Sequence, residues 1–313
     1  MEPEAVSFTS SGTGLRGWFY APGGNGPHPT VVIAHGYSVT HPFIYWRVAE
    51  AFASAGYAVL DFDQRNLGAS GGEHRQRVDL RAQVDDVRAA LAYVRNRPDV
   101  DAARVAIYGT SGGGGVGIEA ALTDPDLAAL LLVVPHVDGL TNAPGMSMRM
   151  RLWLMGRILG DRLGRLAGRA PATVPVFGLP GTRALITQDD CMAAIDEERD
   201  PRGSWVEPGV RYVAGDAEFV NRATCWEILQ LFRLRPGRKL GRVTAPTLMV
   251  IGSKDTLTPP GPQRRAAKGA GVEVFEGPWG HFDPFRRSVG FEESMAATLG
   301  FLERVVPATR STA

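Results

Sequence analysis

Cysteine is scarce in this sequence, whose 313 residues include only Cys191 and Cys225. Two cysteines cannot build a disulfide scaffold. Neither lies in a C-x-x-C pair or in a Cys/His spacing typical of a metal site. The sequence therefore predicts no bound metal, and we expect both thiols to be unreactive because neither has a partner base close in sequence.

An excess of charge of one sign is also missing. Lys and Arg total 34 against 33 Asp and Glu, so the net charge is +1, which gives no reason to expect nucleic acid or an acidic partner. No stretch of about 18 uncharged apolar residues occurs, so no membrane span is expected. The opening Met-Glu-Pro-Glu lacks the basic and apolar regions of a secretory signal. These absences favour a cytoplasmic enzyme or binding protein and leave its oligomeric state open, with a homodimer as one option.

Glycine and proline, by contrast, are abundant, with 38 and 22 residues, and indicate many tight turns. Apolar residues make up 44% and charged residues 21%, as in a globular protein and unlike a disordered chain. At about 100–200 residues per domain, the length fits one large domain or one domain with an insertion.

Short apolar runs alternate with amphipathic segments along most of the chain. Eight runs have the pattern of strands: Val6–Ser10, Leu15–Ala21, Thr30–Ala34, Tyr57–Phe62, Arg104–Tyr108, Leu130–Val134, Thr247–Ile251 and Val272–Phe275. Helical spacing occurs at Ile44–Ala55, Leu80–Arg97, Gly115–Leu122 and Ser294–Val305. The first two strands form a hairpin, and the others are separated by helices, which implies right-handed βαβ crossovers. We predict an α/β fold with an eight-stranded, mostly parallel sheet and helices on both faces.

The regular alternation stops between Val134 and Thr247. A connection of that length far exceeds the usual roughly 2–6 residues between a strand and a helix, and long connections are often functional lids. We interpret residues 138–240 as a helical cap inserted after the sixth strand, called the insertion below. Residues 1–137 and 241–313 then form the core.

One segment of the insertion, Met146–Arg169, carries six arginines and a single acid, Asp161. Its apolar residues recur at helical spacing and are Leu152, Met155, Leu159, Leu163 and Leu166. We predict a helix that packs this apolar face over the site and keeps its arginines in solvent. A helix lying on a membrane surface is the alternative.

The pattern G-x-S-x-G occurs twice, around Ser70 and around Ser111. It supports nucleophilic catalysis only on a sharp strand-to-helix turn that exposes the serine hydroxyl. Ser111 directly follows a strand pattern and begins a helix of small residues, whereas Ser70 lies several residues beyond its strand. We therefore select Ser111 as the nucleophile and interpret Ser70 as a turn residue.

A serine nucleophile needs a base, and the base needs an acid that orients it. In this topology both follow the serine in the chain, on loops after later strands. Asp255 lies just past the seventh strand, and His281 is the only histidine downstream of Asp255. The sequence therefore predicts a Ser111–Asp255–His281 triad. Asp138, which follows the preceding strand, remains a rival for the acid.

An oxyanion formed during acyl transfer needs two backbone donors. We predict that these are the N–H groups of Gly112, directly after the nucleophile, and of Tyr37, on the loop after the third strand. His35 precedes the serine in the chain, so we expect it to position this loop rather than to act as the base. The candidate substrate-pocket residues are Trp153, Met155 and His136.

These motifs together resemble those of the α/β-hydrolase superfamily over nearly the whole chain, and within it the dienelactone-hydrolase-related serine hydrolases with a cap. The matching segments are Ala34-His35-Gly36-Tyr37 for the oxyanion loop, Gly109–Gly113 for the nucleophile elbow, Gly252–Asp255 for the acid loop and Gly280-His281 for the base loop. Asp61–Gly71 is similar to the family's D-x-R-G-x-G-x-S loop but carries Asn66 where glycine is usual, which affects the shape of that loop.

The resemblance implies hydrolysis of an ester, thioester, lactone or amide without a cofactor. The Met, Leu and Trp residues of the insertion favour a small-molecule acyl substrate that is apolar or aromatic. Two alternatives stay open because this fold hosts many chemistries. One is a natural-product tailoring enzyme, such as a cyclase, acyl transferase or epimerase. The other is a non-catalytic binding protein, against which the complete triad argues.

Overall fold

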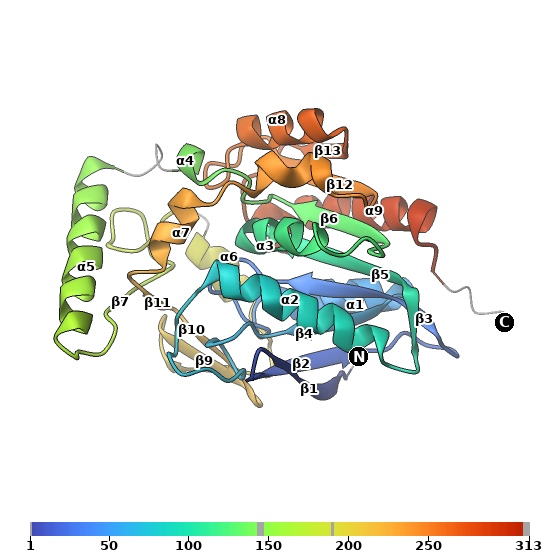
Figure 1. The fold of residues 1–313 in the computed structure, drawn as a ribbon, viewed down its shortest axis with the longest axis horizontal. Coiled ribbons are helices and arrows are strands. Elements are labelled where there is room, and N and C mark those ends of the chain that lie inside the picture. Colours follow the sequence, from blue (N-terminus) through green and yellow to red (C-terminus); the bar gives the residue numbers. More distant parts are fainter. Residues whose placement is uncertain (1, 143–146, 189–190, 309–313) are drawn as a thin grey trace.

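The computed structural model describes residues 2–142, 147–188 and 191–308 and is built around one eight-stranded sheet (Figure 1). In spatial order its strands are β1 (Glu4–Ser10), β2 (Thr13–Tyr20), β4 (Ala58–Phe62), β3 (His28–Ala34), β5 (Val100–Thr110), β6 (Ala129–Val133), β12 (Thr247–Gly252) and β13 (Glu273–Gly277). Strand β2 runs antiparallel to β1 and to β4, and the other neighbours are parallel. The predicted eight-stranded, mostly parallel sheet is confirmed.

Helices cover both faces of this sheet, as predicted. They are α1 (Tyr45–Ser54), α2 (Leu80–Arg95), α3 (Ser111–Ala121), α8 (Pro260–Ala270) and α9 (Val289–Val305). Figure 1 shows α2 and α3 in front of the sheet and α1 and α9 behind it. Every residue of β3, β4, β6 and β12 is buried, because strands covered on both sides have no solvent-facing side.

The insertion lies beyond the carboxyl ends of the parallel strands (Figure 1). Its helices are α4 (Gly139–Asn142), α5 (Met148–Leu166), α6 (Cys191–Glu197) and α7 (Ile228–Arg233). The 3-10 helix η2 (Pro236–Arg242) leads the chain back to the core. A second 3-10 helix, η3 (Asp283–Phe285), belongs to the core and precedes α9. It also contains short strands that the sequence analysis did not predict: β7 (Thr173–Val174) pairs with β11 (Ala223–Thr224), and β8 (Ser204–Glu207), β9 (Arg211–Ala214) and β10 (Ala217–Val220) form a small sheet.

Aromatic packing and one buried ion pair join the insertion to the core. The ring of Phe43 lies 5.2 Å from that of Tyr212 and 4.4 Å from that of Phe219. Glu198, at the end of α6, pairs with Arg47 of α1 at 3.0 Å. The insertion therefore rests on α1 and the loop before it.

The two ends of the insertion lie next to one another. The Gly237 N–H donates to the Val137 carbonyl at 2.9 Å, and the Gly139 N–H donates to the Leu234 carbonyl at 2.8 Å. The chain thus leaves the core and returns to it at one place.

Helix α5 buries a different face from the one predicted. Leu154 and Ile158 pack against Val174, Cys225 and Ile228 of the insertion. The predicted core-facing residues are 57–74% exposed: Leu152, Met155, Leu159, Leu163 and Leu166. The expectation that these residues pack over the site is wrong, because a second apolar pair on the opposite side of the helix takes the buried position. Met146, the first residue of the predicted segment, lies outside the described residues.

Among the helices of the described residues, none is long and apolar enough to cross a membrane.

Candidate active site

Ser111 lies on the sharp turn that joins β5 to α3. Its φ of +49° is a left-handed conformation that non-glycine residues rarely adopt. Close approach explains the flanking glycines: a Cβ on Gly109 would lie 2.8 Å from the Gly113 carbonyl oxygen. One on Gly113 would lie 2.2 Å from the backbone oxygens of Ala34 and His35. Glycine at these two positions lets the turn pack against β3, and the turn presents the Ser111 hydroxyl above the carboxyl end of the sheet.

The structure brings Ser111, His281 and Asp255 together. His281 Nε2 lies 3.1 Å from Ser111 Oγ, and His281 Nδ1 lies 2.8 Å from Asp255 Oδ2. The three residues follow β5, β13 and β12, whose carboxyl ends meet at one edge of the parallel sheet.

The Asp255 carboxylate is held by its own loop. Oδ1 accepts hydrogen bonds from the backbone N–H groups of Leu257 and Thr258, both at 2.8 Å. Oδ2 lies 2.7 Å from the Thr258 hydroxyl, which is also 3.0 Å from the Val134 carbonyl. Thr258 was not singled out from the sequence, although a hydroxyl residue three positions after the acid is the available signal.

Asp138, the rival acid, lies elsewhere. Its carboxylate accepts a hydrogen bond from the Leu140 N–H at 3.0 Å and is 3.4 Å from Arg235 Nε. Asp138 thus organises the first turn of the insertion, and the carboxylate that contacts His281 is that of Asp255.

Tyr37 and Gly112 lie against each other beside the serine. A Cβ on Gly112 would lie 3.2 Å from the Tyr37 nitrogen, and both residues line the same cavity as Ser111. The predicted oxyanion donors are thus neighbours at the cavity that Ser111 also lines.

Tyr45, which sequence reasoning missed, ties the oxyanion loop to the elbow. Its hydroxyl accepts a hydrogen bond from the Gly36 N–H at 2.6 Å and lies 2.6 Å from Thr110 Oγ1. Burial raises the pKa of this hydroxyl to about 12, so it stays protonated at neutral pH. The ring stacks on His35 at 4.1 Å, which gives His35 the predicted positioning contact.

A buried polar cluster supports the same loop from below. Asp61 contacts His35 Nε2 with one carboxylate oxygen and His41 Nδ1 with the other, the latter at 2.6 Å. Burial raises the pKa of Asp61, but the two histidines outweigh it and hold that pKa at about 2. His35 is therefore held by a carboxylate and an aromatic ring and has no contact with Ser111 in the described hydrogen bonds.

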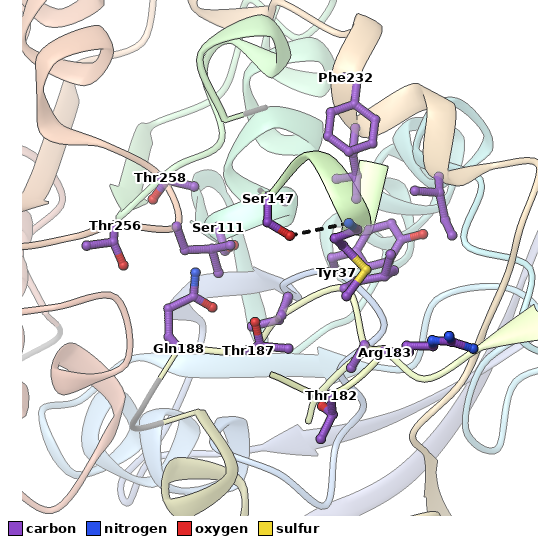
Figure 2. Close-up of a pocket in the computed structure, with 18 of the residues that line it drawn as sticks. Tyr37, Ser111, Ser147, Thr182, Arg183, Thr187, Gln188, Phe232, Thr256 and Thr258 are labelled. Atoms are coloured by element: carbon purple, nitrogen blue, oxygen red, sulfur yellow. Dashed lines mark hydrogen bonds between the residues drawn. The ribbon is translucent and has the colours of Figure 1, made fainter. Parts of the chain in front are cut away.

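A cavity of about 570 Å³ opens over Ser111 (Figure 2). Its wall is mixed: Met150, Trp153, Ile186, Ile228, Leu231 and Phe232 are apolar, whereas Ser147, Arg149, Thr182, Arg183, Thr187, Gln188 and Thr256 are polar. Figure 2 shows Thr256, Thr258 and Gln188 around Ser111. The cavity therefore accepts an apolar group while offering hydrogen bonds near the serine.

Two of the three predicted pocket residues line this cavity. Trp153 projects from the inner side of α5, and His136 follows β6. Burial lowers the pKa of His136 to about 4, so its imidazole is neutral at pH 7. Met155 does not line the cavity; it is 57% exposed, because it lies on the outer side of α5 with the leucines.

A second cavity of about 350 Å³ adjoins the first and shares Gly112 and His136 with it. It lies between α2, α3 and η2, and its polar rim includes Arg81, Arg88 and Lys239. Gly112, directly after Ser111, thus borders both cavities.

No group of three or more His, Cys, Asp or Glu side chains suited to a metal ion occurs in the described part of the chain. Both cysteines are buried, and burial raises the pKa of the Cys225 thiol.

Comparison with known proteins gives a family match and several relatives. The sequence profile described as "Serine aminopeptidase, S33" matches residues 25–190. The quorum-quenching protein AidA of Acinetobacter baumannii is 34% identical over 306 residues, which cover 97% of this chain and 96% of AidA. Polyketide transferase ATR5 of Stachybotrys chlorohalonatus is 29% identical, over 85% of this chain and 84% of that protein.

The fold is also that of a solved α/β hydrolase. The crystal structure of α/β hydrolase GrgF from Penicillium sp. superposes with a TM-score of 0.77 and covers 98% of this chain and 99% of GrgF, at 23% sequence identity.

Proposed function

Because the chain belongs to the serine aminopeptidase S33 family of α/β hydrolases, we propose that it is a serine hydrolase that cleaves a small-molecule ester, thioester, lactone or amide. The contact series Ser111 Oγ–His281 Nε2, 3.1 Å, and His281 Nδ1–Asp255 Oδ2, 2.8 Å, carries this proposal. In this series a nucleophile, a base and an acid that orients the base lie within hydrogen-bond distance of one another.

In the proposed mechanism Ser111 Oγ attacks the substrate carbonyl while His281 Nε2 accepts the hydroxyl proton. The Tyr37 and Gly112 N–H groups donate to the resulting oxyanion. The leaving group departs with the proton from His281 and leaves an acyl group on Ser111. Water then attacks the acyl group while His281 accepts a proton from that water. His281 returns this proton to Ser111 Oγ as the acyl–oxygen bond breaks, and the carboxylic acid leaves. Asp255 keeps the Nδ1 proton on His281, so that Nε2 faces Ser111 as the acceptor.

The shape of the cavity supports an acyl group with an apolar or aromatic portion. Trp153, Ile228 and Phe232 supply apolar wall, and Gln188 and Thr256 offer polar contacts near the reacting carbonyl. A lid role for the insertion follows, since α5, α7 and the segment 181–188 build most of this wall.

Acyl transfer is a second candidate, favoured by one feature. The second cavity, between α2, α3 and η2, is lined by Gly112 and His136 and offers room for an acceptor molecule. A hydroxyl, thiol or amine there takes the place of water, and the acyl group moves to the acceptor. The relative named polyketide transferase ATR5 is consistent with this chemistry.

Labelling with a fluorophosphonate tests the proposal. Wild type should become labelled, because the phosphorus probe captures a serine activated by a base, and Ser111→Ala should not. Ser70→Ala is the control: the Ser70 hydroxyl, which is 3% exposed as a residue and accepts the Arg16 N–H at 2.9 Å, holds a turn away from the triad. Equal labelling of wild type and Ser111→Ala would reject the proposal. Mass spectrometry of the acyl product with and without an added alcohol or amine then separates hydrolysis from transfer.

A further inference from the structure

Helix α5 presents a continuous apolar stripe to solvent. Its members are Met148, Leu152, Met155, Leu159, Leu163 and Leu166, which are 57–74% exposed. At about 100° per residue they fall within an arc of about 80° along the whole helix. A stripe of large, aligned apolar side chains is unlike the scattered single leucines of an ordinary surface.

The packing of α5 in the chain does not account for this stripe. The buried residues of the helix are Leu154, Ile158 and Asp161, on the opposite side. Figure 1 places α5 at one end of the molecule, as its outermost element there. The stripe is therefore an additional surface that a large, flat partner can reach.

The charge of α5 indicates the chemistry of that partner. At about 100° per residue, Arg149, Arg151 and Arg162 flank the stripe. Arg157 and Arg165 project to the other side, where Arg157 donates to the Thr173 carbonyl at 3.3 Å and Arg165 pairs with Glu227 at 3.4 Å. The only acid of the helix, Asp161, is buried and pairs with Arg165 at 3.0 Å. The exposed side of α5 thus combines leucines with arginines and has no acid of its own. A second copy of α5 laid against it would bring arginines together, and an anionic partner would neutralise them.

We propose that α5 binds the surface of a lipid bilayer that contains anionic lipids. The leucine stripe enters the region between headgroups and acyl chains, and Arg149, Arg151 and Arg162 beside it bind lipid phosphates. Gly156, beside the stripe, adds no side chain that would hold the helix away from a flat surface, and a Cβ there would meet nothing within 4 Å. The helix lies on the membrane and does not cross it, in keeping with its arginines.

This arrangement places the cavity beside the bilayer. Met150 and Trp153 line the cavity from the inner side of the helix whose outer side carries the stripe. An apolar substrate dissolved in the bilayer then enters beside α5. The binding itself requires no catalysis, so it stands or fails independently of the proposed hydrolase activity.

Co-sedimentation with vesicles tests the proposal. The full chain is mixed with vesicles of phosphatidylcholine alone or with about 30% phosphatidylglycerol, at about 0.05 M and 0.5 M NaCl. We expect wild type to bind the anionic vesicles, and to bind them less at high salt. The double variant Leu159→Gln/Leu163→Gln should bind the anionic vesicles at least about tenfold more weakly, because two apolar side chains no longer transfer from water into the bilayer.

The matched control is Leu179→Gln, which alters a leucine that is 61% exposed in the insertion outside α5 and should bind like wild type. Circular dichroism and fluorophosphonate labelling check that all variants are folded. Failure of wild type to bind anionic vesicles, or equal binding by the double variant, overturns the proposal. So does light scattering that shows a wild-type dimer and a monomeric double variant, since the stripe would then cover a second copy.

Discussion

Single residues decide how the proposed triad is held, and Asp255 has the most hydrogen-bond contacts among its three members. Its carboxylate receives two backbone N–H groups and lies beside the Thr258 hydroxyl and His281. Asp255→Asn keeps the size of the side chain but allows an amide donor to face His281 Nδ1, which favours the wrong tautomer. We expect kcat on a p-nitrophenyl ester to fall by about 10⁴.

Asp138→Asn is the control for that variant, because Asp138 contacts Leu140 and Arg235 of the insertion and not His281. It should retain nearly all activity. A large loss in Asp138→Asn together with a small one in Asp255→Asn would reverse the assignment of the acid.

His136 makes stability depend on pH. Burial lowers its pKa from 6.5 to about 4, so between these values the unfolded chain holds a proton on this residue that the native state lacks. The native state is therefore penalised as pH falls from 6.5 to 4. In urea unfolding, the free energy of unfolding of wild type should fall by about 2 kcal/mol more than that of His136→Gln between pH 7 and pH 5. Equal losses in the two proteins would mean that His136 is not the responsible group.

The sequence locates most easily those site candidates that lie within a few residues after a strand. The positions of Ser111, Asp255 and His281 each come just after an apolar run, and the parallel topology brings such positions to one edge. Tyr45 and Thr258 escaped because their roles depend on partners from distant segments, such as Gly36 with Thr110 for the first and Val134 for the second. No spacing rule links those pairs.

Among the elements, α5 shows the limit of periodicity. The stripe at 152, 155, 159, 163 and 166 has a clear helical period, and the buried pair Leu154 and Ile158 follows the same period half a turn away. Periodicity predicts the helix, but the choice of buried face depends on which residues of the insertion meet it. Helix α8 was missed for a related reason: it buries only Gln263 and Ala267, which form no apolar pattern.

The two faces of α5 give a matched pair of substitutions. Trp153 lines the cavity and Met155 does not. Trp153→Ala should therefore change the ratio of kcat/KM between long and short p-nitrophenyl esters by a factor that corresponds to roughly 1–3 kcal/mol of transition-state binding. Met155→Ala should leave that ratio unchanged. If Trp153→Ala shifts all chain lengths by one common factor, the insertion covers the site without selecting the acyl group.

At the scale of the whole molecule, stability depends on the contact between the insertion and the core. Glu198 has a fully buried side chain, receives the Arg287 N–H at 2.6 Å and pairs with Arg47 at 3.0 Å. Glu198→Ala leaves a partly buried guanidinium without its carboxylate and should lower the free energy of unfolding by about 3 kcal/mol.

The neighbouring Glu197 provides the comparison. It pairs with Arg286 at 2.7 Å, but 47% of its side chain is exposed. Glu197→Ala should therefore cost less than about 1 kcal/mol. Chemical denaturation of both variants measures the difference, and equal costs would show that burial of the Glu198 pair contributes little.

The overall topology was largely predictable, since strand patterns, the opening hairpin and the order of the loops leave few arrangements of a parallel sheet. The interior of the insertion was not. Its strands β8, β9 and β10 have four residues each and mixed polarity, so local sequence gives them no strand signal. They form because Tyr212 and Phe219 pack around Phe43 of the core, a contact that joins positions about 170 residues apart in the chain.

The hydrogen bond between Gly237 and Val137 has a consequence for how such proteins diversify. Since the chain leaves and re-enters the core at adjacent points, the sheet constrains the distance between those points and not the length of what joins them. The entropy of closing such a loop grows only logarithmically with its length. Evolution can thus exchange the whole insertion as one continuous segment, provided that the new segment covers Phe43. The cavity then changes while the core residues beneath it stay the same. A laboratory chimera with its junctions at Val137 and Gly237 makes the same exchange.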